Sequence, residues 1–398
     1  MNITIHPRKL SGEITAIPSK SQAHRLLICA AFADQPTNLV LADTNRDIEA
    51  TADCLNALGA KIRRTATGYT IDPICNIPTV ATLPCCESGS TLRFLLPIVG
   101  ALGVDGTFLM EGRLPNRPLS PLWEEMERMG CILTRPTPNT LRCTGKLRNG
   151  EYTISGSVSS QFITGLLFAT SLLSGNSQIN ITGALESKPY VDMTLQAMSV
   201  FGIKVTDFKI QGKQRYHSPG TITVEGDWSN GAFFLAATAL GSGVKTLGLN
   251  FESTQGDKAA FDLMSNLKQN ITISAKDIPD LVPILSVVAS CNQGAVFTDI
   301  ARLRLKESDR VASVIAMLEA LGGKATATEH TLTVYPASLT GGTVDSANDH
   351  RIAMSAAIAA TVASGDVTIV NAACVSKSYP KFWEEYRRLG GNYEQYLR

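Results

Sequence analysis

The sequence predicts an α/β protein of two similar domains, each built from three repeats whose apolar helices lie buried in the middle. The chain has 398 residues, more than one hydrophobic core usually serves. A pattern of about 70 residues also recurs six times along it. Each repeat opens with an apolar helix, continues with a hydrophobic strand and a polar loop, and closes with an amphipathic helix. Six such units in two groups of three predict the two domains.

The opening helices start beside a small polar or acidic residue, as helix N-termini commonly do. Segments 92–99 and 162–169 are apolar on nearly every side, which is typical of helices inside a domain. Successive openings are about 69, 69, 68, 50 and 71 residues apart, so one unit is shorter than the others. We expect the six openings at Ser21, Ser90, Ser159, Asp227, Asp277 and Asn348.

The closing helices are amphipathic, as in segment 122–129, and end at an apolar residue followed by glycine. Alternating strands such as 152–155 and 331–335 lie between the helices, bounded by Gly, Pro and Asn. The predicted endings are Leu58-Gly59, Met129-Gly130, Phe201-Gly202, Leu321-Gly322 and Leu389-Gly390, with a weaker one near Leu267.

The domain boundary is expected near residues 225–228, where the fourth opening helix begins. The first fifteen or so residues form a strand that could pair with either half. No low-complexity tract or long linker separates the halves, which favours a hinge over a floppy tether.

Composition excludes several classes of function. The chain is 44% apolar and 18% charged with a net charge of +1, too balanced for a sequence-independent nucleic-acid binder. It shows no signal-peptide pattern and no 18-residue apolar stretch, so we expect a cytoplasmic protein without membrane partners. The nine cysteines and five histidines form no Cys-x-x-Cys pair and no cluster with metal-ligand spacing. No metal site is predicted.

Four helix starts carry unusual polar groups. Backbone N–H groups and the helix dipole make any N-terminus attractive to anions. One such start alone is more simply an ordinary N-cap. Four in one symmetric scaffold favour anion binding instead. They are segments 18–25 with two serines, a lysine and an arginine, 87–93 with Gly89, 157–161 with paired serines and a glutamine, and 348–351 with an arginine.

The loops before the closing helices add lysine and arginine. Solvated surface charge is the alternative interpretation for each residue. Arginine, however, matches carboxylate and phosphate with bidentate geometry, and several such groups suit substrates with several negative charges. These residues are Arg113, Arg117, Lys188, Lys306, Arg310 and Lys377.

Two carboxylates are acid–base candidates. Asp280 precedes an apolar helix, and Glu307 lies between cations in Lys306-Glu-Ser-Asp-Arg310. An aspartate in the first setting is more often a cap, and a glutamate in the second is more often a salt-bridge partner. The chain has no Gly-x-x-x-x-Gly-Lys-Ser/Thr loop and no Gly-x-Ser-x-Gly elbow, so kinase and serine-hydrolase functions lack support.

Over its whole length the chain resembles the EPSP synthase (3-phosphoshikimate 1-carboxyvinyltransferase) family. The resemblance implies two inside-out α/β domains, each of three βαβαββ-type repeats, with the active site in the interdomain cleft. We accordingly expect residues 1–17 with 228–398 in one domain and residues 18–227 in the other. The motifs that carry the resemblance, in family order and spacing, are Pro18-Ser-Lys-Ser-x-x-x-Arg25, Ser159-Ser-Gln161, Lys306-Glu-Ser-Asp-Arg310 and Asn348-Asp-His-Arg351.

The resemblance also implies a reaction and its residues. The enolpyruvyl group of phosphoenolpyruvate passes to the 5-hydroxyl of shikimate 3-phosphate by addition–elimination, with release of phosphate and without a cofactor. The catalytic residues implied are Asp280 as base, Glu307 at the methylene, and Lys20 and His350 as assistants. At shikimate 3-phosphate the family pattern implies Lys20, Ser21, Arg25, Ser159, Ser160, Gln161, Ser187, Tyr190, Asp280 and Lys306. At phosphoenolpyruvate it implies Lys20, Gly89, Arg117, Gln161, Arg310, Arg351 and Lys377.

Two positions depart from the common family pattern, because Glu87 and Arg302 stand where many members have Asn. Gly89, by contrast, keeps the residue that glyphosate-tolerant members often replace by alanine. The resemblance implies that glyphosate occupies the phosphoenolpyruvate site.

Two alternative functions were weighed. UDP-N-acetylglucosamine enolpyruvyl transferase shares the fold and the donor, but its reactive loop carries a Cys in a Gly-Gly-Cys context. The corresponding stretch here, residues 110–118, has none. A non-catalytic sensor of anionic metabolites on the same fold is the other alternative. The joint presence of Asp280, Glu307 and Lys20 favours an enzyme, which we expect to be a monomer acting on small molecules.

Overall fold

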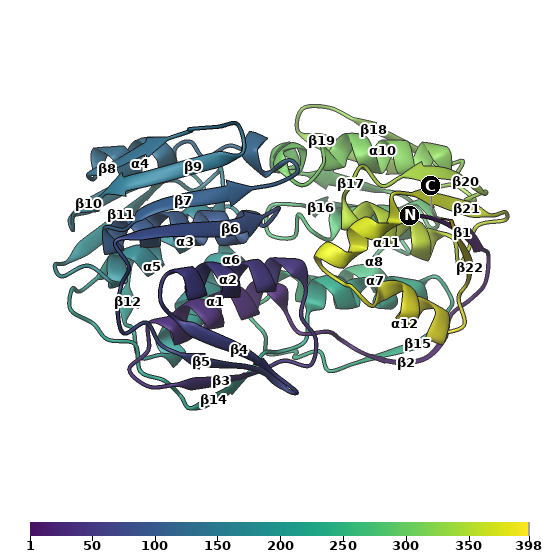
Figure 1. The fold of residues 1–398 in the computed structure, drawn as a ribbon. Helices are drawn as coiled ribbons and strands as arrows, with labels where there is room; N and C mark the ends of the chain where they lie inside the picture. Colours follow the sequence, from purple (N-terminus) through teal and green to yellow (C-terminus); the bar gives the residue numbers. More distant parts are fainter. Residues whose placement is uncertain (397–398) are drawn as a thin grey trace. The chain divides into compact units, whose positions relative to one another are not determined.

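The structure, a computed structural model, describes residues 1–396 and divides into two compact units. The central unit comprises Pro18–Val224, and the terminal unit comprises Met1–Ile17 together with the chain from Glu225 onward (Figure 1). Each unit has its own hydrophobic core. The ranges expected from the sequence differ from these in residues 225–227, which here belong to the terminal unit.

The central unit contains three four-stranded sheets of identical pattern. In each sheet the first strand runs parallel to the second, and a hairpin then adds two antiparallel strands. The sheets are β14(Thr221–Thr223)–β3(Thr37–Val40)–β5(Gly68–Asp72)–β4(Lys61–Thr65), β6(Val80–Cys86)–β7(Asp105–Met110)–β9(Thr140–Gly145)–β8(Cys131–Thr134), and β10(Glu151–Ser155)–β11(Ser177–Thr182)–β13(Lys209–Ile210)–β12(Val205–Thr206).

Three helices fill the middle of the central unit and are buried along nearly their whole length. In Figure 1 they lie between the sheet that contains β6 and β7 and the sheet that contains β3 and β5. This confirms the prediction that the apolar opening helices are buried. The buried helices are α1(Lys20–Ala31), α3(Gly89–Leu102) and α5(Ser160–Ser171); the closing helices are α2(Arg46–Ala57), α4(Leu122–Arg128) and α6(Lys188–Val200).

Helices α3 and α5 pack at close range because of one proline and one glycine. Pro97 has no N–H, so the carbonyl of Arg93, four residues earlier, loses its usual helix donor. Gly165 of α5 lies against that carbonyl, and a Cβ built there would be 2.3 Å from its oxygen. Only glycine therefore permits this approach.

The terminal unit repeats the pattern with two changes. The first repeat of this unit, which is the fourth of the chain, has only two paired strands and no hairpin. This accounts for the short spacing found in the sequence. The N-terminal segment forms two strands rather than one, and both pair within this unit. The sheets are β15(Gly243–Leu247)–β2(Ser11–Thr15), β16(Ile271–Ser274)–β17(Ala295–Thr298)–β19(Thr331–Tyr335)–β18(Lys324–Ala327), and β20(Gly342–Asp345)–β21(Val367–Val370)–β1(Asn2–His6)–β22(Asn392–Tyr396).

Buried helices again form the middle of the terminal unit. They are α7(Trp228–Ala239), α9(Val282–Ser290) and α11(His350–Ala359), and the closing helices are α8(Ala260–Asn266), α10(Arg310–Ala320) and α12(Phe382–Arg388). Short 3-10 turns lie before several closing helices: η1(Leu114–Asn116), η2(Gly256–Ala259), η3(Ala301–Leu305) and η4(Ala372–Lys377).

The observed helix starts differ from four of the six predicted openings. Ser159 and Asp227 are N-caps as expected. Ser19 and Ser88 cap α1 and α3 in place of Ser21 and Ser90, since each motif offers two serines two residues apart and sequence does not distinguish them. Asp349 caps α11 in place of Asn348, and α9 begins at Val282, five residues after Asp277.

The predicted closings were correct. Each of the five apolar–glycine endings has its apolar residue at the C-cap. The glycine that follows has a φ between +78° and +112°, the left-handed region that non-glycine residues avoid. Leu267 is likewise the C-cap of α8 but has no glycine after it. Among residues 1–396, no helix combines the length and the apolar character that crossing a membrane requires.

Candidate anion-binding and proton-transfer site

The start of α1 presents Lys20 and Ser21 at the surface of the central unit. Lys20 Nζ lies 2.9 Å from Asp47 Oδ2, a carboxylate in the first turn of α2. Both side chains keep about a sixth of their surface exposed, at 17% and 18%. The Ser19 hydroxyl caps the helix by accepting from the backbone N–H of Gln22. The ammonium is thus held in place while remaining accessible to a ligand.

Arg25, one turn further along α1, is almost fully buried with 2% exposure. Its guanidinium donates to Thr194 Oγ1 at 2.8 Å and to the carbonyls of Ser21 and Tyr190 at 2.6 and 2.8 Å. It also lies over the Phe94 ring, 5.0 Å from the centroid. No described residue places a carboxylate within ion-pair distance of it. Burial lowers the pKa of Arg25 to about 10, so it stays charged at neutral pH.

The start of α6 supplies two other predicted positions, Ser187 and Tyr190. Tyr190 contributes its carbonyl to the guanidinium. Ser187 precedes α6 with a φ of +54° and is buried. Ser159 caps α5 and Ser160 is its first residue, so these hydroxyls lie at a third helix N-terminus of the same unit.

Gly89, Arg117 and Gln161 form a second group in the central unit. A Cβ built on Gly89 would lie 2.6 Å from Arg117 NH1, so that guanidinium rests against the bare α-carbon. Gln161 donates through Nε2 to Ser90 Oγ at 2.9 Å. Its Oε1 accepts from Arg93 NH1 at 2.9 Å. The structure therefore brings these three predicted residues together through side chains of α3 and α5.

Arg93 is the last residue of the predicted segment 87–93 but is not among the predicted site residues. It is 3% exposed, and its NH2 donates to the carbonyl of Pro118, next to Arg117. Its NH1 lies 2.8 Å from the position of a Cβ on Gly89. The sequence signal was an arginine inside an otherwise apolar helix, where burial requires a partner.

In the terminal unit, Arg310 lies at the centre of three carboxylates. Its Nε donates to Asp349 Oδ2 at 2.9 Å, its NH1 to Asp280 Oδ1 at 2.6 Å, and its NH2 to Glu307 Oε2 at 2.6 Å. The arginine is 1% exposed, whereas Asp280 and Glu307 are 19% and 27% exposed. NH1 and NH2 each carry a second N–H that these bonds do not use. Asp349 was missed from sequence, although it lies inside the quoted Asn348–Arg351 motif.

Asp280 is held by three cations. Besides Arg310, it accepts from Arg351 NH2 at 3.0 Å and lies 3.7 Å from Lys306 Nζ. Burial alone would raise its pKa, but Arg351, Lys306 and Arg310 outweigh that and hold the pKa well below its usual value. Burial lowers the pKa of Lys306 to about 8, despite the attraction of Asp280. Asp280 is therefore ionised at neutral pH, and Lys306 loses its charge in mildly basic solution.

The start of α11 supplies the remaining predicted residues. Asp349 caps it by accepting from the Arg351 N–H, and His350 is its buried first residue. Lys377 Nζ, at the end of η4, donates to the carbonyl of Asn348 at 3.1 Å. All the predicted residues of the terminal unit thus lie around the starts of α10 and α11 and the loop before α9.

Asp257 in η2 is a further titratable group near these residues. It is 3% exposed. Burial and the charge of Asp280 raise its pKa to about 6, against the opposing charge of Arg351. Only the fold connects this residue with Asp280, so sequence gave no signal for it.

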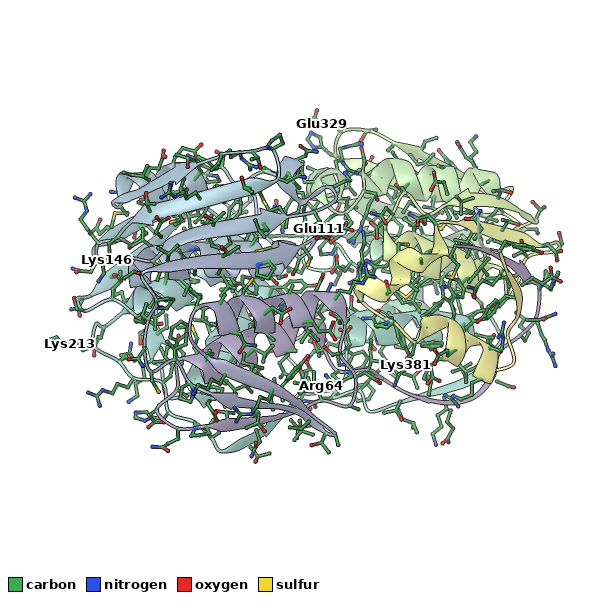
Figure 2. All side chains as sticks on the ribbon, viewed as in Figure 1. Arg64, Glu111, Lys146, Lys213, Glu329 and Lys381 are labelled. Atoms are coloured by element: carbon green, nitrogen blue, oxygen red, sulfur yellow. The ribbon has the colours of Figure 1, made fainter. Side chains whose placement is uncertain are left out.

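Other charged side chains are solvated at the surface, which was the alternative interpretation for the lysines and arginines of the loops. Figure 2 shows Lys146 and Lys213 pointing outward from the central unit, and both are exposed. Lys188 forms an exposed pair with Asp192 at 2.7 Å, and Arg113 is exposed. The family departures lie at Glu87, whose carboxylate packs where a Cβ of Gly112 would be, and at Arg302 in η3.

The predicted residues thus form one set in each unit. Lys20, Ser21, Arg25, Gly89, Arg117, Ser159, Ser160, Gln161, Ser187 and Tyr190 belong to the central unit, and Asp280, Lys306, Glu307, Arg310, His350, Arg351 and Lys377 to the terminal unit. The expectation that ligands bind in the interdomain cleft stays a prediction. Among residues 1–396, no three His, Cys, Asp or Glu side chains are grouped as a metal site would require.

Comparisons with known proteins agree over the whole chain. The family model described as EPSP synthase (3-phosphoshikimate 1-carboxyvinyltransferase) matches residues 5–386. A protein of Clostridium kluyveri named 3-phosphoshikimate 1-carboxyvinyltransferase is 38% identical over 420 residues, covering 99% of this chain and 98% of its own. One of the same name from Clostridium novyi is 39% identical over 426 residues, with 98% of each chain covered.

A solved structure shares the fold. An EPSP synthase from Acinetobacter baumannii matches with a TM-score of 0.81 at 23% identity, covering 99% of this chain and 100% of that one. At that identity the likeness concerns the fold, and it confirms the predicted α/β class.

Proposed function

We propose, because this chain belongs to the EPSP synthase family, that it transfers the enolpyruvyl group of phosphoenolpyruvate to the 5-hydroxyl of shikimate 3-phosphate and releases phosphate. The chain is an enzyme of the shikimate pathway, which leads to chorismate and the aromatic amino acids. The observation in its structure that supports this best is Arg25, a buried guanidinium whose hydrogen-bond partners are all neutral oxygens. A buried cation of this kind favours an anionic ligand.

Shikimate 3-phosphate is assigned first to the central unit. We assign its phosphate to the helix starts of α1, α5 and α6, which supply backbone N–H groups and hydroxyls, together with Arg25. In the terminal unit the ring hydroxyls meet Asp280 and Lys306. The central-unit residues proposed for this substrate are Lys20, Ser21, Arg25, Ser159, Ser160, Gln161, Ser187 and Tyr190.

Phosphoenolpyruvate is assigned to cations from both units. The absence of a Cβ on Gly89 lets the Arg117 guanidinium lie against the backbone, and Gln161 is held nearby through Arg93 and Ser90. Arg310 keeps its second N–H groups on NH1 and NH2 for the carboxylate. The remaining residues proposed for this substrate are Lys20, Arg351 and Lys377.

The reaction proceeds in two stages. In the addition, the 5-hydroxyl oxygen bonds to C2 of phosphoenolpyruvate, its proton leaves to a base, and C3 gains a proton to become a methyl group. In the elimination, the methyl group loses a proton and the C2–O bond to phosphate breaks, which restores the double bond. The surrounding cations stabilise the charge that develops on carboxylate and phosphate.

The carboxylates differ in their suitability for these proton transfers. Asp280, ionised and held by Arg310 and Arg351, is the acceptor for the hydroxyl proton. Glu307 accepts from Arg310 NH2 and is more exposed than Asp280, at 27% against 19%, so we assign it to proton exchange at the methylene carbon. Lys20 and His350 assist.

The reaction uses no metal or other cofactor, and we propose that the protein acts as a monomer in the cytoplasm. Nucleic acids and membranes are not among its proposed partners.

Phosphate release is the direct test. Purified protein should release phosphate when phosphoenolpyruvate and shikimate 3-phosphate are both present, and not with either alone. Replacing shikimate 3-phosphate by UDP-N-acetylglucosamine should give none; the opposite result would identify the rival transferase. Binding of shikimate 3-phosphate without turnover would support the sensor instead.

The Arg25 assignment has its own test. Arg25→Gln should raise the dissociation constant for shikimate 3-phosphate about 10- to 100-fold, because a charge-assisted contact is lost. Arg64→Gln removes an exposed arginine of β4 in the same unit and should leave that constant unchanged.

A further inference from the structure

A chain of side-chain hydrogen bonds crosses the core of the central unit and ends beside Gly89. His24 of α1 is fully buried, and its Nδ1 lies 2.7 Å from Thr51 Oγ1 of α2. That oxygen is 2.7 Å from Thr91 Oγ1 of α3. Thr91 Oγ1 in turn donates to Ser88 Oγ at 2.7 Å. Ser88 is the N-cap of α3, so the chain joins three helices at the residue before Gly89.

The hydrogen bonds of this series all run in one direction, which determines the tautomer of His24. Each hydroxyl has one hydrogen to donate. Thr91 donates its hydrogen to Ser88, so Thr51 donates to Thr91, and His24 donates to Thr51 through Nδ1–H. Nε2 of His24 is then a bare lone pair, and it has no hydrogen-bond partner among residues 1–396. Burial and the nearby Lys20 and Arg25 lower the pKa of His24 well below its usual value, so the ring is neutral.

A second contact links the same chain to Lys20. Thr91 Oγ1 lies 3.4 Å from the carbonyl oxygen of Asp47. The carboxylate of Asp47 holds Lys20 Nζ at 2.9 Å. The start of α3 is therefore tied to α1 through His24, and the Asp47 backbone, whose side chain holds Lys20, lies against the same threonine.

We propose that His24 is a positioning residue for phosphoenolpyruvate, which acts through Thr51 and Thr91 to hold Ser88 and Gly89 in place relative to Lys20. The inference rests on the proposed function, because Gly89 and Lys20 are assigned to that substrate. Buried hydrogen bonds are directional, so the chain resists displacement of the α3 start more strongly than apolar packing alone. His24 itself touches neither substrate in this scheme.

Thr51→Val is the sharpest variant, because it breaks the middle of the chain with little change in shape and leaves α1 and α3 intact in sequence. We expect its KM for phosphoenolpyruvate to rise about three- to tenfold, with a smaller change in kcat and in the KM for shikimate 3-phosphate. His24→Phe should show the same pattern. His24→Asn should restore the wild-type KM, since its amide nitrogen stands as many bonds from the backbone as Nδ1.

Thr170→Val is the matched control. Thr170 is another buried threonine of this unit, but its hydroxyl donates only within α5, to the carbonyl of Leu166 at 2.7 Å. Its loss should lower stability without changing the ratio of the two KM values. A folded Thr51→Val enzyme with an unchanged KM for phosphoenolpyruvate, or with equal changes in both KM values, would overturn the proposal.

A measurement on the wild-type protein separates this inference from the proposed function. Nitrogen-15 NMR of labelled histidine should show His24 as the neutral Nδ1–H tautomer, with the signal altered in Thr51→Val. An Nε2–H tautomer would refute the hydrogen-bond direction and with it the proposal, even in an enzyme that turns over. Absence of phosphate release by the wild type would instead refute the proposed function.

Discussion

Arg310 donates from NH1 to Asp280 Oδ1 across 2.6 Å, and this bond joins the start of α10 to the loop before α9. Arg351 holds the other oxygen of the same carboxylate at 3.0 Å. A carboxylate between two guanidinium groups stays ionised but becomes a weaker base. Asp280 is therefore ionised at neutral pH and free of a proton. It becomes an effective proton acceptor when substrate binding draws some of this positive charge away from it.

We predict that Asp280→Asn lowers kcat by about 10²–10⁴-fold, because the amide keeps the shape but accepts no proton. Substrate dissociation constants should change less than kcat, which single-turnover kinetics and titration calorimetry would measure. Asp262→Asn, at an exposed position of α8, is the control. Turnover equal to the wild type would reduce Asp280 to a structural partner of Arg310.

The lowered pKa of Lys306 predicts that kcat/KM for shikimate 3-phosphate depends on pH. Its folded pKa of about 8 lies below the ordinary 10.5, because burial disfavours the ammonium. The charge needed for shikimate 3-phosphate is therefore present below pH 8 and is lost as pH rises through that value. We expect kcat/KM for this substrate to fall above about pH 8, since that ratio reports the free enzyme.

Stability should respond to the same group with the opposite sign. Between pH 8 and 10.5 the unfolded chain binds the Lys306 proton more tightly than the folded one. The contribution of Lys306 to stability thus rises with pH across that window.

The kinetic prediction is tested by substitution. Lys306→Arg should shift the falling limb of kcat/KM to higher pH, whereas Lys324→Arg at an exposed position of β18 should not. A limb that stays in place in Lys306→Arg would assign it to another group.

Gly89→Ala tests the close approach to Arg117. The added methyl would lie 2.6 Å from Arg117 NH1 and 2.8 Å from Arg93 NH1, so both guanidinium groups must shift. Overpacking of about 1–3 kcal/mol corresponds to about a 5- to 150-fold loss of affinity. We expect glyphosate to compete with phosphoenolpyruvate, and the variant to raise its inhibition constant more than the KM of the smaller substrate.

Inhibition constants from steady-state assays would decide this point. Gly243→Ala is the control, because a Cβ there meets only atoms at 3.7 Å or more. If wild type and Gly89→Ala were inhibited equally, the steric argument would fail. Weak inhibition of both would instead direct attention to Glu87, the added carboxylate near this site.

Gly165→Ala tests the packing of α3 on α5. A methyl 2.3 Å from the Arg93 carbonyl oxygen cannot be accommodated without moving backbone. We expect the free energy of unfolding to fall by about 1–3 kcal/mol or more, seen as a lower urea midpoint. Gly243→Ala should remain close to wild type. An unchanged midpoint in Gly165→Ala would show that the two helices separate easily.

Sequence alone was sufficient for the local pattern. The buried opening helices follow from their lack of a polar face, and the closings follow from the left-handed glycine after each C-cap. The motif residues of each unit, such as Arg25 and Arg310, were also identified in advance, because their order and spacing are specific. Their substrate roles remain predictions.

The tertiary structure decided what depends on distant parts of the chain. Strand β1 fills the place between β21 and β22, and β14 completes the first sheet of the central unit although it comes last in that unit. Pairing of this kind depends on which sheet edge is open, and no local pattern records it. An arginine in an apolar helix marked Arg93 in the sequence, but its approach to Gly89 and the charge coupling of Asp257 to Asp280 depend on the fold, because they arise where separate segments meet.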